Sequence, residues 1–152
     1  MKTRWMIRAD LPRVLEIDRR TFRYCWDEPT FLGVLQDRST VAQVIEKKES
    51  VVGYVVYQLI KSRLKITRMA IHPNYRNKGC GTSLINKLKI KLSPERRHTL
   101  EIVIDEYLTE ALLFFKSQGF VSTDTWRNYW PNGVDGIQME YTIKCRQKTL
   151  IP

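Results

Sequence analysis

The chain has 152 residues, of which 43% are hydrophobic and 28% charged, and its formal net charge is +10. This composition is typical of a folded globular domain and excludes a disordered, collagen-like or low-complexity chain. No apolar run reaches the roughly 18–20 residues of a membrane span, and the first residues lack the apolar core of a signal peptide. We therefore expect a cytoplasmic protein with one domain over residues 1–145 and a basic tail over 146–152.

The first half of the chain shows helical periodicity followed by β-type patterns. Asp10 and Pro12 are typical of the start of a helix. Val/Tyr-rich and alternating segments then indicate strands. We expect helices over 11–22 and 29–35, an aromatic loop over 24–26, and strands over 41–46, 51–60 and 64–71.

The second half begins with a basic, glycine-containing loop over 74–82. Gly119 is a typical helix stop, and Pro131-Asn132-Gly133 is typical of a hairpin turn. We expect helices over 83–92 and 109–118, and strands over 99–104, 121–129 and 137–143. This order of elements predicts a mixed α/β fold with one sheet and helices packed on it.

Cysteine and histidine spacing argues against a metal centre. The three cysteines, Cys25, Cys80 and Cys145, lie far apart, and the two histidines are isolated at His72 and His98. This spacing offers neither a disulfide framework nor a zinc motif. We expect reduced cysteines and no metal.

A short loop joins the third long strand to the next helix, with the sequence Arg76-Asn77-Lys78-Gly79-Cys80-Gly81-Thr82. Its glycines let the backbone turn sharply, so that main-chain N–H groups converge at the positive end of a helix dipole. Such a site suits a phosphate, although the loop matches neither the P-loop nor the dinucleotide fingerprint. An ordinary strand–helix turn is the alternative.

The positive charge is concentrated around this loop. Residues 61–100 hold eleven Lys and Arg and one acid, Glu95, so the whole net charge lies there. A basic region of this kind favours a polyanionic partner, which could be a nucleic acid, a phosphorylated cofactor or an acidic protein. A solvated basic surface is the alternative.

The order of these motifs resembles the GNAT superfamily of acetyl-CoA-dependent N-acetyltransferases. Residues 66–81 resemble that family's fourth strand, pyrophosphate loop and following helix, and residues 111–120 resemble its next helix with a terminal Gly-Phe pair. Residues 9–12, 22–26, 127–131 and 138–141 resemble the bacterial ribosomal-protein-alanine N-acetyltransferases. The resemblance implies a central, mostly antiparallel sheet that is splayed between strands 4 and 5, with helices on both faces.

The resemblance also implies acetyl-CoA as acetyl donor, without a metal. Its pantetheine arm would pair with the main chain of Met69, Ala70 and Ile71. Its pyrophosphate would bind the loop amides, here Arg76, Asn77, Lys78, Gly79, Cys80, Gly81 and Thr82. The basic residues Lys87, Lys89 and Lys91 could attract a further phosphate. The implied reaction is direct attack of a primary amine on the thioester in a ternary complex.

Three positions depart from the family pattern. The resembling subfamily has a strand-5 Glu, an Asn at the start of the next helix and a Tyr later on it, where this chain has Val103, Leu108 and Phe115. Glu101 points to the same face of the strand as Val103 and is our candidate base, acting through water. Tyr129 is our candidate acid or substrate contact.

An N-terminal α-amine is the acceptor we expect, and a ribosomal protein is one candidate to carry it. Its pKa of about 8, against about 10.4 for lysine, leaves about 10²-fold more neutral amine at pH 7. Phe22, Trp26 and Tyr129 could line a slot for the first acceptor residues, or simply pack together. Alternatives are a small-molecule amine as acceptor, or a catalytically impaired CoA-binding regulatory module. The chain lacks base-reading motifs, so we do not expect direct nucleic-acid binding.

Overall fold

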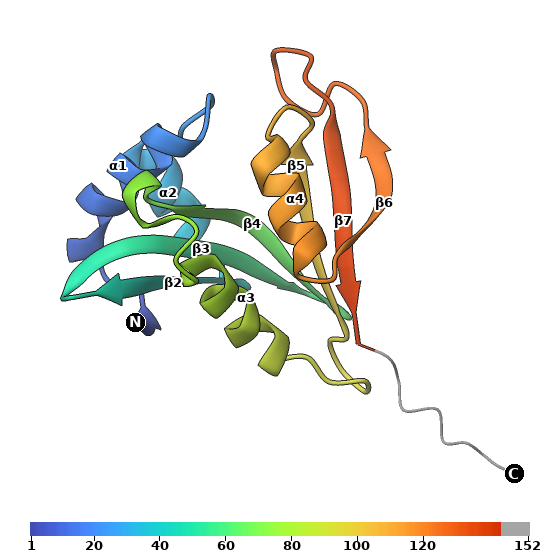
Figure 1. Cartoon of the computed structure of the whole chain (residues 1–152), viewed down its shortest axis with the longest axis horizontal. Helices are drawn as coiled ribbons and strands as arrows, with labels where there is room; N and C mark the ends of the chain where they lie inside the picture. Colours follow the sequence, from blue (N-terminus) through green and yellow to red (C-terminus); the bar gives the residue numbers. More distant parts are fainter. Residues whose placement is uncertain (144–152) are drawn as a thin grey trace, which may run out of the picture. The chain divides into compact units, whose positions relative to one another are not determined.

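The computed structural model describes residues 1–143 (Figure 1). These residues form two compact units. The first unit contains residues 1–59 and 67–87, and the second contains residues 60–66 and 88–143. Strand β4 (Arg63–Ile71) begins in the second unit and ends in the first. The basic tail expected over 146–152 lies outside the described residues.

The first unit contains four strands and three helices. The strands are β1 (Lys2–Trp5), β2 (Thr40–Lys47), β3 (Ser50–Ile60) and the second half of β4; the helices are α1 (Leu11–Thr21), α2 (Glu28–Leu35) and most of α3 (Cys80–Ile90). Strand β1, which the sequence did not predict, pairs antiparallel with β2 from Lys2↔Glu46 to Trp5↔Gln43. It escaped prediction because it is short, charged and without apolar alternation, as edge strands often are.

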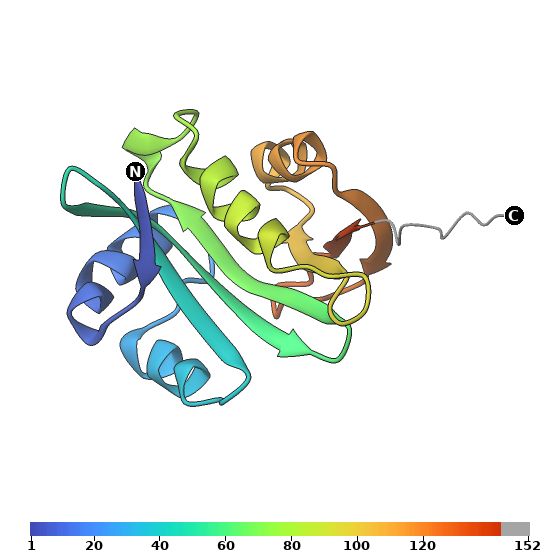
Figure 2. The same cartoon turned by 90° about the horizontal axis from the view of Figure 1, so that it is seen from below.

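Helices cover both faces of these strands, as the family resemblance implies. Figure 2 shows α1 and α2 on one side and α3 on the other. The core beneath α1 and α2 consists of Leu11, Val14, Ile17, Phe31, Val44, Val51, Tyr54, Val56 and Ala70. Helix α3 buries Leu84, Ile85 and Leu88, which follow a helical spacing.

The second unit contains the start of β4, β5 (Thr99–Asp105), α4 (Thr109–Ser117), β6 (Val121–Trp126) and β7 (Gly136–Thr142). Strand β4 pairs in parallel with β5 from Arg63↔Thr99 to Ile66↔Ile102. Strands β5 and β6 both pair antiparallel with β7. The hydrogen-bonding order of the strands is β1-β2-β3-β4-β5-β7-β6, which confirms the predicted mixed α/β fold with a mostly antiparallel sheet.

Two element boundaries differ from prediction by three residues, and the other predicted boundaries agree within two. Helix α3 begins at Cys80 instead of residue 83, because Gly79 with φ +86° already ends the loop. Strand β6 ends at Trp126 because Asn128 adopts a left-handed φ of 51° and donates its N–H to Asp135 Oδ1 at 2.9 Å. The turn between β6 and β7 is therefore wider than a tight hairpin.

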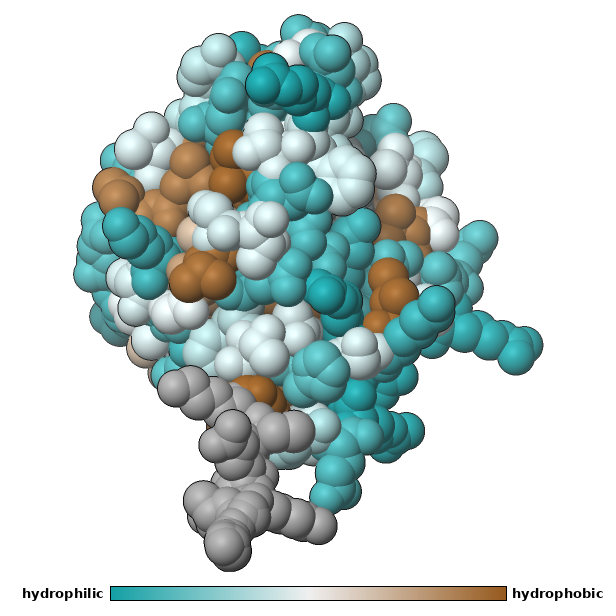
Figure 3. Space-filling view, turned by 90° about the vertical axis from the view of Figure 1, so that its right-hand side faces the viewer, coloured by the Kyte–Doolittle hydropathy of each residue, from teal (hydrophilic) through white to brown (hydrophobic). Residues whose placement is uncertain are grey.

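All six residues of β6 are exposed. Figure 3 views the side of the molecule on which β6 is drawn in Figure 1, and hydrophobic residues there appear as separate patches among hydrophilic ones. Within residues 1–143, no helix is long and apolar enough to cross a membrane. The same residues include no group of three or more His, Cys, Asp or Glu side chains arranged to hold a metal ion.

Candidate active site

The loop between β4 and α3 has the backbone geometry that an anion site requires. Asn77 and Gly79 both adopt left-handed conformations, with φ of 59° and 86°. Ser83 N donates to Gly79 O at 2.9 Å near the start of α3. Cys80 and Gly81 begin the first turn of α3, and the N–H groups that open a helix point toward its N-terminal end. These amides lie at the positive end of the helix dipole, which suits a phosphate.

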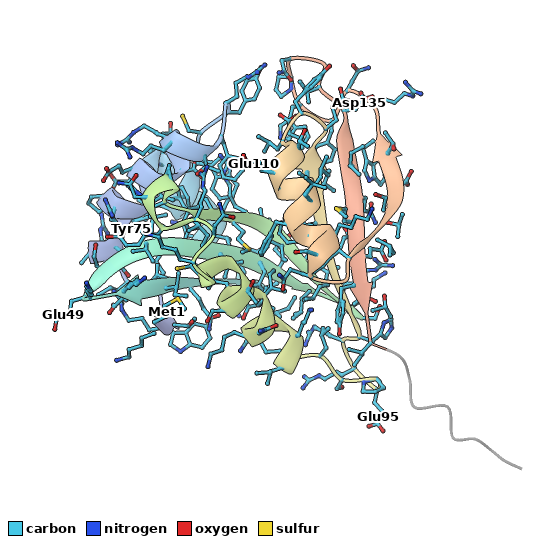
Figure 4. The ribbon with its side chains drawn as sticks, viewed as in Figure 1. Met1, Glu49, Tyr75, Glu95, Glu110 and Asp135 are labelled. Atoms are coloured by element: carbon cyan, nitrogen blue, oxygen red, sulfur yellow. The ribbon has the colours of Figure 1, made fainter. Side chains whose placement is uncertain are left out.

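Arg76 fixes this loop to its neighbours. Its Nε donates to Ile71 O at 2.9 Å, and its Nη2 donates to Thr21 Oγ1 at 3.0 Å. The loop is therefore held between the end of β4 and α1, and Arg76 shapes the site by positioning its backbone. Lys78 Nζ lies 5.8 Å from the ring centroid of Tyr75, which Figure 4 labels in the 3-10 turn before the loop.

The electrostatics of this segment favour an anion. Residues 67–87 include four Lys or Arg and no Asp or Glu.

Two side chains near the loop are engaged within the protein. Cys80 is 1% exposed, and its Sγ contacts Met1 Sδ at 3.4 Å, so its thiol fills space in the core. Lys89, expected on the exposed basic face, instead donates to Gln118 O at 2.6 Å and lies over the ring of Tyr141. Burial lowers the pKa of Lys89.

The end of β4 approaches β3 very closely. A Cβ on Gly53 would lie 3.0 Å from Ala70 O and 2.5 Å from Ile71 Cδ1, so glycine is required for this approach. Thr67 Oγ1, at the start of the same segment, is buried and has no hydrogen-bond partner among the described residues. An unsatisfied buried hydroxyl is uncommon and fits a segment where a polar ligand adds the missing partner.

His72 follows β4 directly and is buried. Its Nδ1 accepts the N–H of Asn74 at 3.1 Å, which shapes the start of the loop. Burial lowers the pKa of His72, and the nearby cations Arg13 and Arg20 lower it further. The imidazole is thus favoured in its neutral form.

The aromatic loop after α1 is tied to β4 by a buried ion pair that the sequence analysis missed. Arg68 Nε and Nη2 donate to Asp18 at 2.7 and 2.9 Å, and the Tyr54 hydroxyl also donates to Asp18. Burial and the Asp18 charge raise the pKa of Tyr54 well above its usual value, so this hydroxyl keeps its proton. The available signal was the position of Asp18 on the apolar stripe of α1, seven residues after Leu11 and four after Val14.

Phe22 and Trp26, both predicted to line the acceptor slot, pack around the same arginine. The Arg68 guanidinium lies 3.9 Å from the Phe22 ring centroid and 4.7 Å from that of Trp26. Trp26 also meets Phe31 edge to face at 4.9 Å. The aromatic residue that this loop exposes is instead Tyr24, at 40%.

In the second unit, Glu101 forms part of an ion-pair cluster. Arg63 Nη1 lies 2.9 Å from Glu101 Oε1 and 3.0 Å from Glu140 Oε1, and the two carboxylates face each other across β5 and β7. Although burial alone would raise the pKa of Glu140, hydrogen bonds from Thr123 and Gln138 and the charge of Arg63 lower it. Glu101 is thus a partly buried carboxylate with a cationic partner.

Tyr129 lies in the turn between β6 and β7, in which Figure 4 labels Asp135. It is 43% exposed, and its ring meets Trp130 edge to face at 4.7 Å. A Cβ on Gly136 would lie 3.1 Å from Tyr129 Cγ and 2.5 Å from Val103 Cγ1. Tyr129 and Val103 therefore pack on the same glycine, which brings Tyr129 close to strand position 103.

Leu108 and Phe115 serve packing and helix geometry. Leu108 is the N-cap of α4 and makes no side-chain capping bond. Phe115 is 4% exposed and meets Phe114 and Phe120 edge to face, both at 5.1 Å.

Comparison with known proteins identifies consistent relatives. A family model described as an acetyltransferase (GNAT) domain matches residues 20–143. The chain is 24% identical over 123 residues to a ribosomal protein bS18-alanine N-acetyltransferase of Salmonella typhimurium, covering 81% of this chain and 82% of the relative. It resembles the crystal structure of the Escherichia coli ribosomal-protein-S18-alanine N-acetyltransferase with a TM-score of 0.83 at 23% identity, covering 99% and 98% of the two chains. Arabidopsis thaliana NAA60 in complex with acetyl-CoA gives a TM-score of 0.80 at 16% identity, covering 93% and 99%.

Proposed function

Because this chain belongs to the GNAT acetyltransferase family and is an N-acetyltransferase, we propose that it moves the acetyl group of acetyl-CoA onto the α-amine of a protein N-terminus. The observation that carries the proposal is the loop between β4 and α3. Its left-handed residues Asn77 and Gly79 present first-turn amides in a segment without acids.

The residues present fit acetyl-CoA. The amides of residues 77–82 suit its pyrophosphate, and Arg76 holds them in place in advance. The main chain of Met69, Ala70 and Ile71 is assigned to the pantetheine arm, and the unsatisfied hydroxyl of Thr67 lies just before it. The solved structure of NAA60, which has a similar fold, was determined with acetyl-CoA.

An N-terminal α-amine is the favoured acceptor class. The named relatives are alanine N-acetyltransferases of ribosomal protein bS18, so an N-terminal alanine of a ribosomal protein is the acceptor we propose. The chemistry supports this choice, since an α-amine is about 10²-fold richer in its neutral form than a lysine at pH 7. An enzyme without a strong general base therefore loses less of its rate on an α-amine than on a lysine.

In the proposed reaction the neutral amine attacks the thioester carbonyl, so that a C–N bond forms and the C–S bond breaks. We assign removal of the amine proton to Glu101 through a water held by its Oε2, since Oε1 accepts from Arg63. Tyr129, close to Val103, is assigned to the departing thiolate, which takes up a proton. An amide near Ala70 or Ile71 would hold the oxyanion.

The proposal is tested by calorimetry followed by an assay. Acetyl-CoA is titrated into the protein, with CoA and an adenine dinucleotide as controls, and we expect selective micromolar binding, about −8 kcal/mol. Transfer is then measured to a peptide with a free N-terminal alanine, to the same peptide with a blocked N-terminus and an internal lysine, and to small amines. Transfer confined to the lysine or to small amines would refute the acceptor assignment.

Single substitutions test the assigned residues. Gly81→Glu places a charge in the first turn of α3 and should abolish acetyl-CoA binding. Glu101→Gln should lower kcat by about 10²-fold or more and change its pH profile. Glu140→Gln is the matched control, because Glu140 shares the Arg63 partner but has no assigned role. Tyr129→Phe should lower kcat without changing the affinity for acetyl-CoA.

A CoA-binding regulatory module is the second candidate. The packing of Phe115 against two phenylalanines and the apolar Leu108 favour it, because both stand where the resembling subfamily has functional side chains. Tight acetyl-CoA binding with no transfer to any amine would select this candidate over the enzyme.

A further inference from the structure

Asp18 accepts as many hydrogen bonds as a carboxylate can. Its four donors are Arg68 Nε at 2.7 Å, Arg68 Nη2 at 2.9 Å, Trp26 N at 2.7 Å and the Tyr54 hydroxyl. Asp18 and Tyr54 are 0% exposed, and the Arg68 side chain is 9% exposed. The four lone-pair positions of the carboxylate are thereby filled, and its charge is balanced inside the protein.

The network reaches the backbone of the aromatic loop at two points. Trp26 N donates to Asp18, and Arg68 Nη2 donates to Tyr24 O at 2.6 Å. The guanidinium also stacks between the rings of Phe22 and Trp26. Residues 22–26, which form no helix or strand, are thus held at both backbone and side-chain level.

The same arginine lies directly before the segment assigned to the pantetheine arm. Arg68 precedes Met69 on β4, so the loop and the thioester-binding strand share one rigid connection. Tyr24, whose carbonyl Arg68 holds, exposes its side chain to solvent. The loop therefore presents an exposed aromatic residue whose backbone carbonyl is held by the arginine that precedes the assigned pantetheine segment.

We propose that Asp18, Tyr54 and Arg68 are positioning residues that hold loop 22–26 in one conformation for the acceptor peptide, with Tyr24 as its contact. This inference rests on the proposed function, since it needs a peptide acceptor. It makes acceptor binding a property of a preformed surface, which avoids the entropy cost of ordering the loop at each encounter.

Stability alone does not account for the network. A buried ion pair usually contributes little more than well-packed apolar residues of the same volume. Here two of the bonds go to the backbone of an irregular loop, where an apolar core would leave the Tyr24 carbonyl and the Trp26 amide without these partners. The arrangement is suited to fixing loop position.

The test compares mild variants with a matched control. Arg68→Lys keeps the charge but loses the two-pronged geometry, and Tyr54→Phe removes one donor while keeping the ring. Arg4→Lys is the control, because Arg4 Nη1 and Nη2 each lie 2.8 Å from Asp10 in the same unit without contacting the loop. Tyr24→Ala probes the contact itself without altering the network.

Two readouts are measured for each variant. The first is hydrogen exchange of the Trp26 amide in the free protein, which we expect to rise about tenfold in Arg68→Lys and less in Tyr54→Phe. The second readout is a pair of constants, the KM for the N-terminal peptide and the Kd for acetyl-CoA, each compared with its wild-type value. We expect the peptide KM to rise about tenfold in Arg68→Lys and Tyr24→Ala, with the acetyl-CoA Kd within twofold of wild type.

Each outcome decides the inference. Unchanged Trp26 exchange in Arg68→Lys and Tyr54→Phe would overturn it, and so would faster exchange with an unchanged peptide KM, which would mark a purely structural network. Equal effects in Arg4→Lys would also overturn it. A wild-type protein that binds acetyl-CoA but acetylates no peptide would refute the proposed function, and acceptor positioning would fall with it, whereas the exchange data would still report loop fixation separately.

Discussion

The two halves of β4 each carry an arginine paired with carboxylates, yet the two pairs lie in very different surroundings. Arg68, in the first unit, is 9% exposed and binds an Asp18 that is 0% exposed. Arg63, in the second unit, is 39% exposed and shares two carboxylates, Glu101 and Glu140, that are 15% and 14% exposed.

Burial decides what such a pair can do. Breaking a fully buried pair leaves an uncompensated charge inside the protein, which is costly. The intact pair therefore holds the groups bound to it rigidly. A half-exposed pair is screened by water and can exchange partners at little cost. The Arg68 pair is thus suited to fixing a loop, whereas the Arg63 pair holds its two carboxylates less rigidly.

The strongest test of this comparison is to break the buried pair outright. Asp18→Asn should lower the free energy of unfolding by about 3–5 kcal/mol, because Arg68 would remain buried without a counter-charge. Urea unfolding measures this. Glu101→Gln, the equivalent change in the partly buried Arg63 cluster, should cost less, about 1 kcal/mol, because Arg63 keeps Glu140 as a partner. Equal losses in the two variants would contradict the comparison.

A second test changes the backbone packing of the half of β4 that belongs to the first unit. Gly53→Ala places a Cβ 3.0 Å from Ala70 O and should lower the free energy of unfolding by about 1–3 kcal/mol. The same variant should weaken acetyl-CoA binding, since it displaces the assigned pantetheine strand. Gly33→Ala is the control, because nothing lies within 4 Å of its Cβ. A stable Gly53→Ala variant with normal binding would count against this assignment.

A third test concerns His72, which follows the same half of β4. Its pKa is lowered in the fold, so its stabilising effect is complete above the unfolded value of about 6.5 and is lost as pH falls below it. His72→Gln should therefore flatten the fall in unfolding free energy below pH 6.5, by at most about 1.4 kcal/mol per pH unit. Chemical unfolding from pH 7.5 to 5 measures the slope, and an unchanged slope in His72→Gln would contradict this prediction.

The smallest effect is expected at the partly exposed arginine of the Arg63 cluster. Arg63→Met should change the free energy of unfolding by about 0–1 kcal/mol, and the difference should shrink in high salt. Unfolding curves at low and high salt provide the measurement. A loss above about 2 kcal/mol, insensitive to salt, would show that this cluster behaves like the buried one.

Local signals made much of the fold predictable. Asp10 and Pro12 correctly placed the start of α1, and the glycines around Cys80 marked the turn into α3. Such signals involve only a few neighbouring residues, so they can be recognised without knowledge of the fold. Strand β1 lacked such a local signal, because three of its four residues are polar and its pairing with β2 spans about forty positions.

The sharp turn of the loop was predictable from the sequence, whereas the ion-pair network was not. The turn expected from the glycines is present at Gly79, which has a φ of 86°, although the helix begins at Cys80 and not at residue 83. The partners of Asp18, in contrast, are separated from it by 36 and 50 residues, and nothing local couples them. Glu101 is likewise 38 residues from Arg63, so its ion pair emerged only with the fold.

The saturation of Asp18 has a consequence for how this lineage can diverge. Because its donors come from Trp26, Tyr54 and Arg68, no one of the three side chains at positions 18, 54 and 68 can change without leaving a buried group unsatisfied. A joint replacement by apolar residues avoids that penalty. Substitutions at these positions should therefore be epistatic, and descendants of this sequence should retain or exchange Asp18 and Arg68 together.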